Sequence, residues 1–502
     1  MRRIHAVLAA STLAAACSTP NFDYPREPSF ALDPSVDTAT KRGVDAWRAR
    51  NVGPCGFYPL PDGADALAVR LRLIEAAERT IDAQYFLMKS DAAGYVFAGA
   101  LHAAAERGVR VRLLLDDIFT TFRDDEMALL DAHPNVELRL FNPISRRGIG
   151  ILNFVNDFRR ANRRMHNKSF IVDNQAAVVG GRNIADEYFD LRPEGKFLDF
   201  DVLAIGPVAA DVSAQFDVFW NHERSLPLEA VQGKTSEAQL ERLRAWIRTD
   251  KTEAAERAYD AAIRSDLMRT FDDPDATLYS ASATLITDRP DKLTNDIGSE
   301  HMVLVSELVE TLEESTSEVI VISPYFVPGD DGVAFWRGLV EGGRRVVVLT
   351  NSLAANNHTA VHSAYRRYRK DLVRAGVELY EIRAYVDGAS GEQSALTLHT
   401  KVMMIDGDQL FVGSLNLDPR SIEINSEMGL VVDSAELVEG LRTPLLRGLE
   451  EFAYRITLDE RGRTRWSARI GGEDVVETSE PQASSWLLFS AWFQAIAPER
   501  ML

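Results

Sequence analysis

Apolar and polar positions alternate along this chain in a pattern that predicts helices and strands in turn. Residues 66–80 and 94–108 carry apolar side chains at the helical period, whereas residues 81–88 and 109–117 form short apolar runs typical of buried strands. Strands that alternate with helices predict parallel or mixed sheets covered by helices on both faces. The expected fold class is therefore α/β.

The same order of elements returns in the second half of the chain. Residues 306–352 repeat helix, strand, helix and strand, and residues at the strand ends repeat with them. Tyr85 corresponds to Tyr325, and Asp116 corresponds to Asn351. The pattern indicates a tandem duplication of one α/β unit of roughly 180 residues, a usual domain size.

These patterns divide the chain into six expected segments. They are a signal peptide (1–16), a tether rich in Pro, Ser, Thr and Asp (17–45), a first domain (46–225), a charged helical connector (226–298), a second domain (299–455) and a C-terminal extension with an aromatic amphipathic segment (456–502). Within the connector, residues 234–266 have charged residues at helical spacing, which favours a solvated helix. An arm that binds a partner is the alternative.

Composition narrows the function. The chain has 502 residues, 46% of them apolar, which is enough for more than one buried core. Its formal net charge is -19, whereas proteins that neutralise nucleic-acid phosphates normally have a basic surface. The charge therefore argues against a nucleic-acid partner, but it leaves room for a local basic pocket.

The N-terminal residues are typical of an export signal. Arg2 and Arg3 precede a short apolar run, small residues and Cys17, which resembles a bacterial lipoprotein site. Ala14 departs from that pattern, because a larger aliphatic residue is usual there, so ordinary secretion and an uncleaved anchor stay open. We expect acyl chains on Cys17 to hold the protein to a membrane, facing the periplasm of a Gram-negative-type envelope. Cys55 is expected to be structural.

One motif, H-x-K-x4-D, occurs twice as "HNKSFIVD" and "HTKVMMID". Both stretches are rich in strand-forming residues, and alternate side chains of a strand share a face. Each histidine therefore shares a face with the lysine two positions later, His166 with Lys168 and His399 with Lys401. Each motif aspartate falls on the opposite face or in a turn, so we expect a structural role first, with a catalytic role as the alternative. These aspartates are Asp173 and Asp406.

A turn follows each motif and supplies uncharged hydrogen-bond donors. The candidates for holding a phosphate oxygen are Asn183, Ser414 and Asn416. If the duplicated halves face each other, two histidines, two lysines and two asparagines meet in one cleft. That set fits phosphodiester chemistry, in which one imidazole attacks phosphorus and the other donates a proton. The lysines provide the positive charge, so we expect no cofactor and no metal ion.

With these motifs, and with "GGRNIADEYF" and "NSEMGLVV", residues 46–455 resemble the phospholipase D superfamily, and more narrowly the bacterial cardiolipin synthases. The resemblance implies two α/β sandwich domains, related by a pseudo-twofold axis, that share one active site. It also implies a phosphatidyl-histidine intermediate, with His166 as the nucleophile and His399 as the acid, although the order stays open.

The resemblance further implies a carboxylate beyond each motif that orients a histidine. Glu427 matches that position in the second half and Asp199 in the first, with Asp201 as a rival. Gly181 stands where the second copy has Ser414, so the phosphate cradle is not expected to be symmetric.

The expected reaction is cardiolipin formation at a membrane surface from phosphatidylglycerol, with phosphatidylethanolamine as a further candidate substrate. A lipid hydrolase, an endonuclease and a non-enzymatic lipid-binding module are the alternatives. The sequence leaves the oligomeric state open.

Basic and aromatic stretches outside the motifs suggest contacts with lipid. We expect some of the arginines before the first motif to line the cleft mouth (Arg159, Arg160, Arg163 and Arg164), with residues 366–370 as a second basic group or a solvated helix face. Residues 146–158 and 484–498 are candidate membrane contacts. For residues 484–498, a helix docked on the core is the alternative.

Overall fold

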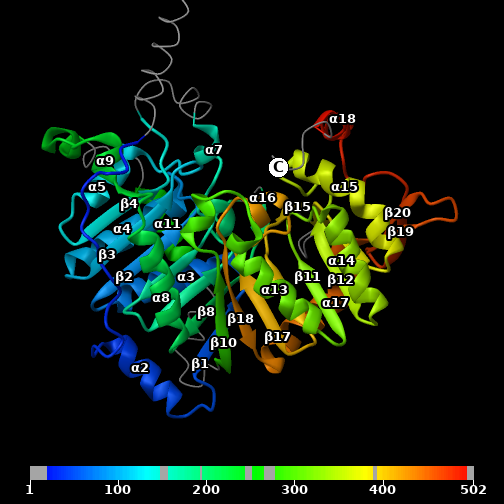
Figure 1. Ribbon diagram of the computed structural model, residues 1–502, viewed down its shortest axis with the longest axis horizontal. Helices are drawn as coiled ribbons and strands as arrows, with labels where there is room; N and C mark the ends of the chain where they lie inside the picture. The colour runs from blue at the N-terminus through cyan, green and yellow to red at the C-terminus, as the bar shows by residue number, and fades with distance from the viewer. Residues whose placement is uncertain are drawn as a thin grey trace, which may run out of the picture.

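The computed structural model describes residues 20–146, 157–192, 195–242, 252–264, 278–387 and 393–494. They form two α/β lobes that stand side by side, with the N-terminal lobe on the left and the C-terminal lobe on the right in Figure 1. Each lobe packs helices against a mixed sheet. The expected α/β fold class is confirmed.

Three parallel strands form the centre of the first lobe. They are β2 (Thr80–Tyr85), β3 (Arg110–Asp116) and β4 (Val136–Phe141). Antiparallel strands continue the sheet, with β9 (Ser225–Pro227) beside β4 and, from β2 outward, β5 (Ser169–Val172), β6 (Ala176–Gly180), β8 (Asp201–Ile205) and β1 (Cys55–Leu60). The main helices of this lobe are α3 (Gly63–Ala76), α4 (Ala92–Glu106), α5 (Asp124–Asp131), α8 (Val208–Trp220) and α11 (Thr252–Ile263). Asp62 and Asp91 cap α3 and α4 by accepting hydrogen bonds from N–H groups of their first turns.

The second lobe repeats this arrangement strand for strand. Its parallel strands are β11 (Glu318–Ile322), β12 (Arg345–Asn351) and β13 (Glu378–Ile382), and from β11 outward the antiparallel strands are β16 (Val402–Ile405), β17 (Gln409–Gly413), β18 (Met428–Asp433) and β10 (Tyr279–Thr287). Its main helices are α13 (Val303–Glu314), α14 (Gly329–Glu341), α15 (Thr359–Arg374) and α17 (Ala435–Phe452). The same pairing order in both lobes confirms the tandem duplication.

Two strand pairings cross from one lobe to the other. Strand β1 pairs with β10, so that eighteen of the described strands form one sheet. Separately, β7 (Lys196–Leu198) pairs in parallel with β15 (Gln393–Leu398), which also pairs with β14 (Tyr385–Asp387). Because β7 precedes Asp199 and β15 precedes His399, the second pairing brings residues of the two lobes together at the functional site.

The described residues bury three apolar clusters. One lies in the first lobe between its sheet and helices α3, α4, α5 and α11, and another lies in the second lobe under α13, α14 and α15. The third joins the lobes, because it contains residues of β6 and β17 as well as residues of α8 and α17. The lobes are therefore held together by a shared core in addition to the strand pairings.

Residues 20–38 lie along the first lobe instead of forming a free tether. The backbone N–H of Ala31 donates to Asp217 at 2.8 Å, and Asn174 and Gln175 donate to the carbonyl oxygens of Leu32 and Pro34. Helix α2 (Ala39–Arg48) follows. Composition could not predict this, because the attachment depends on backbone groups that bond to side chains far away in the sequence.

The connector and the C-terminal extension also belong to the lobes. Helix α11 buries Ala258 and Ala262 against the first lobe, so it is not solvated on all sides. Strands β19 (Ala453–Leu458), β20 (Thr464–Ile470) and β21 (Glu473–Glu477) continue the second sheet beyond β13, and the expected boundary at residue 455 divides β19. No helix in the described part of the chain has the length and apolarity needed to cross a membrane.

Candidate active site

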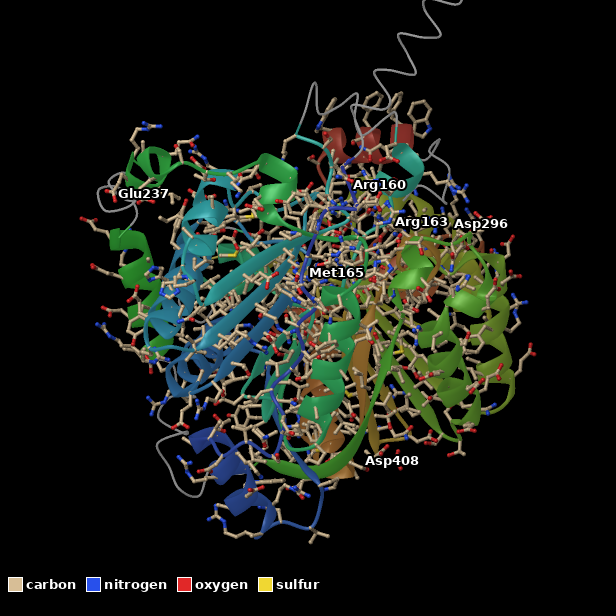
Figure 2. The ribbon with its side chains drawn as sticks, turned by 60° about the vertical axis from the view of Figure 1, so that its left-hand side comes forward. Arg160, Arg163, Met165, Glu237, Asp296 and Asp408 are labelled. Carbon is tan, nitrogen blue, oxygen red and sulfur yellow. The ribbon has the colours of Figure 1, made fainter. Side chains whose placement is uncertain are left out.

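Each motif histidine is held just ahead of a strand by the end of a neighbouring parallel strand. In the first lobe the carboxylate of Asp116, at the end of β3, accepts a hydrogen bond from the Met165 N–H at 3.0 Å. In the second lobe Asn351, at the end of β12, exchanges hydrogen bonds with the backbone of Leu398 at 2.8 and 2.9 Å. These equivalent residues fix the position that precedes His166 and His399, and Figure 2 shows Met165 near the centre of the molecule.

The two histidines open into one pocket. The pocket has a volume of about 640 Å³ and is lined by residues of both lobes, including His166, His399, Asn183 and Asn416. Both imidazoles are otherwise buried, so substrate reaches them only through this space. The structure therefore brings together the histidines that the sequence placed in separate motifs.

Each lobe supplies the carboxylate that orients the histidine of the other lobe. His166 Nδ1 lies 2.8 and 3.0 Å from the two carboxylate oxygens of Glu427, and His399 Nδ1 lies 2.6 Å from Oδ2 of Asp199. The backbone follows the same crossing, because the His166 N–H donates to the Ser426 carbonyl and the His399 N–H to the Leu198 carbonyl. With Nδ1 held by a carboxylate, Nε2 of each ring is left for the substrate.

The rival carboxylate, Asp201, has another role. It is fully buried, and Arg70 donates to it at 2.8 Å, with Arg182 also close by. Asp199 is therefore the first-lobe carboxylate that contacts a histidine. Asp201 lies on β8, which is interior to the sheet because it pairs with both β1 and β6.

Burial and positive neighbours keep both imidazoles neutral in the empty pocket. Burial, followed by the charges of Lys168 and Lys401, lowers the pKa of His166 well below its ordinary value. Burial and Lys401 lower the pKa of His399 to about 3, although Asp199 opposes this change. A neutral imidazole is the form that can act as a nucleophile.

The two motif lysines lie beside their histidines. The Nζ of Lys168 donates to the carbonyl of His166 at 2.5 Å, and Lys401 donates to the carbonyl of His399. Burial lowers the pKa of Lys168 to about 7 and that of Lys401 to about 8. The negative charge of a bound anionic substrate would compensate the positive charges of both lysines. Among the residues that the structure describes, no three His, Cys, Asp or Glu side chains are grouped to hold a metal ion.

The asparagines and the serine of the turns form hydrogen bonds with different partners. Asn183 and Asn416 line the pocket, where their amides donate to Tyr188 and Ser421, and the oxygen of Asn416 is buried without a hydrogen-bond partner. The Ser414 hydroxyl instead donates to Glu427 at 2.5 Å. Ser414 thus orients a carboxylate behind the histidine, and the expectation that it binds the phosphate is corrected.

The glycine at the equivalent position of the first lobe has a steric cause. A Cβ atom at Gly181 would lie only 2.1 Å from Oδ1 of Asp199. Aspartate is shorter than glutamate, so it brings its carboxylate group closer to its own backbone and to the turn. Each lobe therefore places a carboxylate against the histidine of the other lobe. The first lobe does so with Gly181 and Asp199, and the second with Ser414 and Glu427.

The motif aspartates lie outside the pocket. Asp173 accepts hydrogen bonds from the N–H groups of Arg79 and Thr80 at 2.8 and 2.9 Å, where β2 begins. Asp406 accepts them from the N–H groups of residues 316–318, where β11 begins. In Figure 2, Asp408 marks this end of the second motif at the lower edge, away from Met165. The structure thus gives these aspartates the structural role and not the catalytic one.

The arginines before the first motif do not line the pocket. Arg164 is buried and pairs with Asp116, Arg163 donates to the Lys292 carbonyl, and Arg160 pairs with Asp157. Arg159 is exposed and pairs with Asp296. Their guanidinium groups satisfy carbonyls and carboxylates around the segment that enters the site, and the expectation of a basic cleft mouth is wrong. Figure 2 shows Arg160 and Arg163 in the upper part of the molecule.

The second basic stretch is also structural in part. Arg369 is buried and pairs with Glu381 and Glu480, each at 2.8 Å. Of the suggested membrane contacts, residues 147–156 lie outside the described residues, as does Cys17 with the expected signal.

Two cations that line the pocket were missed by the sequence reasoning, Lys89, which pairs with Glu187, and Arg420. Arg420 lines the pocket and donates to the side chain and backbone oxygens of Asn162 at 2.7 and 2.8 Å. Among the described residues, no carboxylate pairs with Arg420. The repeat itself held a signal, because Arg420 lies four residues after Asn416, where the first copy has Glu187 after Asn183. Aromatic rings were missed as well, with Phe197 stacked on His399 and Phe86 against the edge of His166.

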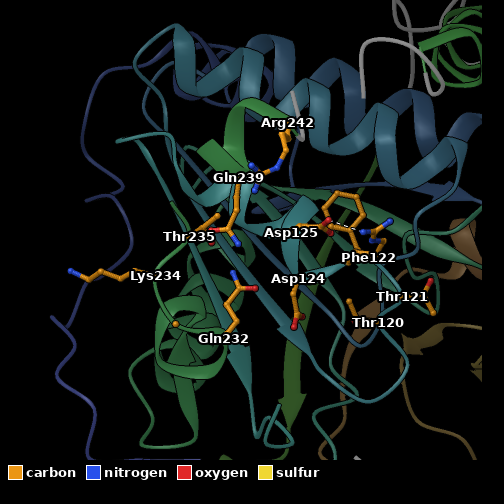
Figure 3. A pocket seen from close by; sticks show the side chains of 12 residues that line it. Thr120, Thr121, Phe122, Asp124, Asp125, Gln232, Lys234, Thr235, Gln239 and Arg242 are labelled. Atoms are coloured by element: carbon orange, nitrogen blue, oxygen red, sulfur yellow. Dashed lines mark hydrogen bonds and ion pairs between the residues drawn. The ribbon is translucent and has the colours of Figure 1, made fainter. Parts of the chain in front are cut away.

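A larger cavity of about 850 Å³ adjoins this pocket, and the two share Thr121. Its lining comes from residues 120–125 and 232–242, including Lys234, Gln239 and Arg242 (Figure 3). It contains no histidine, so the histidine chemistry belongs to the smaller pocket.

The comparison with known proteins agrees with this geometry. Residues 71–220 and 308–447 match the sequence model of the family described as "Cardiolipin synthase, PLD-like domain". The chain belongs to this phospholipase D-like cardiolipin synthase family. The two matched segments coincide with the two lobes, each of which contains one copy of the motif.

Relatives within the cardiolipin synthase family cover nearly the whole chain. Cardiolipin synthase C of Escherichia coli (strain K12) is 39% identical over 466 residues, which are 90% of this chain and 97% of that protein. A cardiolipin synthase of Clostridium perfringens (strain SM101 / Type A) is 23% identical over 81% of this chain and 73% of its own. The crystal structure of phosphatidylserine synthase from Haemophilus influenzae Rd KW20 has a TM-score of 0.58 at 14% identity, covers 92% of this chain and 100% of its own, and supports the fold.

Proposed function

We propose that this protein transfers a phosphatidyl group from one phospholipid to a headgroup hydroxyl of another, and so forms cardiolipin. The observation that carries the proposal is a single pocket in which two histidines, one from each lobe, each have a carboxylate at Nδ1. Membership of the cardiolipin synthase family and the similarity to cardiolipin synthase C support the same reaction.

In the first step Nε2 of His166 attacks the phosphorus atom of the donor lipid and forms a phosphorus–nitrogen bond. The bond from phosphorus to the headgroup oxygen breaks, and His399 in its protonated form gives its Nε2 proton to that oxygen. Lys168 and Lys401, with the Asn183 and Asn416 amides, stabilise the phosphoryl oxygens while charge redistributes.

In the second step a hydroxyl of the acceptor lipid replaces the departed headgroup. His399 takes the proton of the hydroxyl, the oxygen attacks phosphorus, and the bond to His166 breaks. Phosphatidylglycerol as donor and acceptor gives cardiolipin and glycerol, whereas phosphatidylethanolamine as donor gives cardiolipin and ethanolamine. Arg420, a cation without a paired carboxylate, is suited to hold the phosphate of the second lipid.

The two carboxylates support this division of labour between the histidines. Although burial opposes it, His399 and Lys401 hold the pKa of Asp199 below its usual value, so Asp199 stays ionised and favours a protonated His399. Burial raises the pKa of Glu427 to about 7, and in its ionised form Glu427 accepts the Nδ1 proton of a neutral His166 and leaves the Nε2 lone pair for the attack. The anionic phosphate of a bound lipid adds to the stabilisation of a protonated His399.

The experiment is to incubate the purified protein with phosphatidylglycerol, with and without phosphatidylethanolamine, and to identify the products by mass spectrometry. We expect cardiolipin from the wild type and a loss of at least about 1,000-fold in turnover for His166→Ala and for His399→Ala, with folding retained. Phosphatidic acid as the main product would replace the transferase with the hydrolase. Substantial activity in either variant would contradict the two-histidine scheme.

We also propose that acyl chains on Cys17 attach the protein to a membrane that faces an exported compartment. The basic, apolar and small residues ahead of Cys17 support this placement. The intact mass of the protein isolated from its native envelope tests it, because acylation adds the mass of the lipid groups.

A further inference from the structure

The helix near the end of the described chain presents aromatic rings to the solvent. Helix α18 (Ser485–Gln494) contains no charged residue. The exposed fractions are 74% for Trp486, 52% for Phe489, 63% for Trp492 and 62% for Phe493. Soluble proteins rarely expose a contiguous apolar patch without a binding function, so this face calls for a partner.

The aromatic face is rigidly presented, because the opposite side of α18 packs on α15. Ala491 is buried there, and the Ser363 hydroxyl on α15 donates to its carbonyl at 2.8 Å. The exposed rings lie in a row, with centroids 5.8 Å apart for Trp486 and Phe489 and 6.1 Å apart for Phe489 and Trp492. In Figure 2, α18 lies at the upper edge of the molecule with aromatic rings directed away from its body.

Helix α15, on which α18 packs, also borders the active-site pocket. His358 and Val361, at the start of α15, line the pocket together with both catalytic histidines. Phe119, another exposed aromatic residue, lines the same pocket. Helix α15 therefore contacts α18 and also borders the pocket that contains the histidines. A bilayer that binds the rings of α18 would lie close to this pocket.

The first described residues reach this side of the molecule too. The ring of Phe22 lies under the guanidinium group of Arg160, which belongs to the short helix α7 (Phe158–Ala161). Asn162 directly follows α7 and lines the pocket. Figure 1 shows α7 and α18 along the same upper edge, with α2 at the opposite end. A membrane anchor shortly before residue 20 would hold this edge against the bilayer.

We propose that α18 inserts its aromatic rings into the interface of a phospholipid bilayer and holds the active-site pocket against that surface. The inference rests on the proposed function, which places the substrates in a bilayer. Tryptophan and phenylalanine rings partition into the headgroup region. The net charge of -19 repels an anionic bilayer, so the attachment of this face depends on apolar contact and not on charge.

The first test measures whether these rings enter lipid. The full-length protein is mixed with vesicles of phosphatidylglycerol and phosphatidylethanolamine that carry brominated acyl chains, which quench nearby tryptophan emission. We expect strong quenching in the wild type, unchanged by 0.5 M salt (roughly a 4 Å screening length), and most of that quenching lost in Trp486→Phe/Trp492→Phe. Equal quenching in both proteins would overturn the proposal.

The second test measures whether insertion serves catalysis. Trp486→Ala/Trp492→Ala should lower turnover of vesicle lipids by about tenfold or more and leave turnover of a short-chain, monomeric phosphatidylglycerol unchanged. Alanine favours helix, so α18 is retained. Val476→Ala, which removes an equally exposed apolar side chain on β21, is the matched control and should change neither.

Three outcomes would contradict the bilayer as the partner. They are unchanged vesicle turnover in the alanine variant, an equal loss on both substrates, or a wild-type dimer in sedimentation that the variant abolishes, which would assign the face to a second copy of the chain. Failure of the proposed function looks different, because the wild type would then form no product from either lipid while its tryptophans are still quenched by vesicles.

Discussion

The buried lysines beside the two histidines, Lys168 and Lys401, have pKa values near neutral pH, so their charge is sensitive to pH. Lys168 and Lys401 are surrounded by protein and face two imidazoles that burial keeps neutral. Loss of a proton from either lysine would remove a cation that the phosphoryl oxygens need in the transition state. We therefore expect the lysines to set the alkaline limit of the pH range of activity.

We expect kcat/KM to fall as the pH rises through the range set by these lysines. Burial lowers the pKa of Lys168 to about 7 and that of Lys401 to about 8, so both are charged below that range and neutral above it. A pH profile with a monomeric lipid measures this decline. Lys168→Met should lower kcat at least about 100-fold at pH values where Lys168 is charged, and the difference from the wild type should shrink as the pH rises above about 7. A profile that stays flat to pH values well above 8 would contradict the assignment.

At the residue scale, the sequence allowed us to predict the residues that recur at the same spacing in both motifs. The histidines and lysines recur at fixed offsets, and in the structure both histidines line the pocket with a buried lysine beside each. The partners across the lobes could not be assigned from offsets, because Glu427 and Asp199 meet the opposite histidine only through the β7–β15 pairing and the Met165–Ser426 bridge. Counting charges near a motif was misleading for the arginines, whose guanidinium groups satisfy internal oxygens.

At the scale of elements, the strand of each motif, β5 or β16, is fixed at both ends. One end is the histidine, and the other is an aspartate that accepts hydrogen bonds from the backbone where β2 or β11 begins. Although burial opposes it, the N–H groups of residues 316–318 lower the pKa of Asp406 to about 2. The aspartate thus sets the register of the strand that carries the histidine.

Asp406→Asn should weaken the fold and spare the chemistry. We expect a loss of roughly 1–3 kcal/mol in the free energy of unfolding, with kcat within about threefold of the wild type. Urea denaturation and turnover of the surviving folded protein measure the two effects. Stability gained from the ionised Asp406 is full above the ordinary aspartate pKa and is lost as the pH falls towards 2. A variant as stable as the wild type but inactive would restore the catalytic role.

Helices and strands with an apolar period were correctly predicted, and the charged connector contains a helix as expected, but the attachment of polar segments to the first lobe was not predicted. Residues 20–38 and α11 have polar compositions, and their attachment depends on a few contacts such as the hydrogen bond from Tyr259 to Glu75. Such contacts are specified by the tertiary structure and leave no periodic signal.

At the scale of the whole molecule, the lobes behave as one structural unit. The shared core contains Val179 of β6 and Leu410 of β17, and strand pairing continues from β1 to β10. Neither lobe could lose its packing without exposing apolar surface of the other. We therefore expect the two repeated domains to unfold together as one cooperative unit.

We expect Leu410→Ala to shift a single calorimetric transition of the whole chain to lower temperature. The residue is fully buried in the shared core, and such truncations cost about 2–5 kcal/mol. The calorimetric and van't Hoff enthalpies should agree in the wild type and in the variant. Two separate transitions, of which only one moves, would show that the lobes unfold independently.

The exchange of carboxylates between the lobes has a consequence for the ancestry of the fold. A protein with one lobe would carry a histidine whose partner acid points away, towards a neighbour that is missing. Such an ancestor would gain a working site only by pairing with a second copy of itself. Joining the copies in one polypeptide would make that pairing permanent, and it would free each half to change its turn, as Gly181 and Ser414 have done.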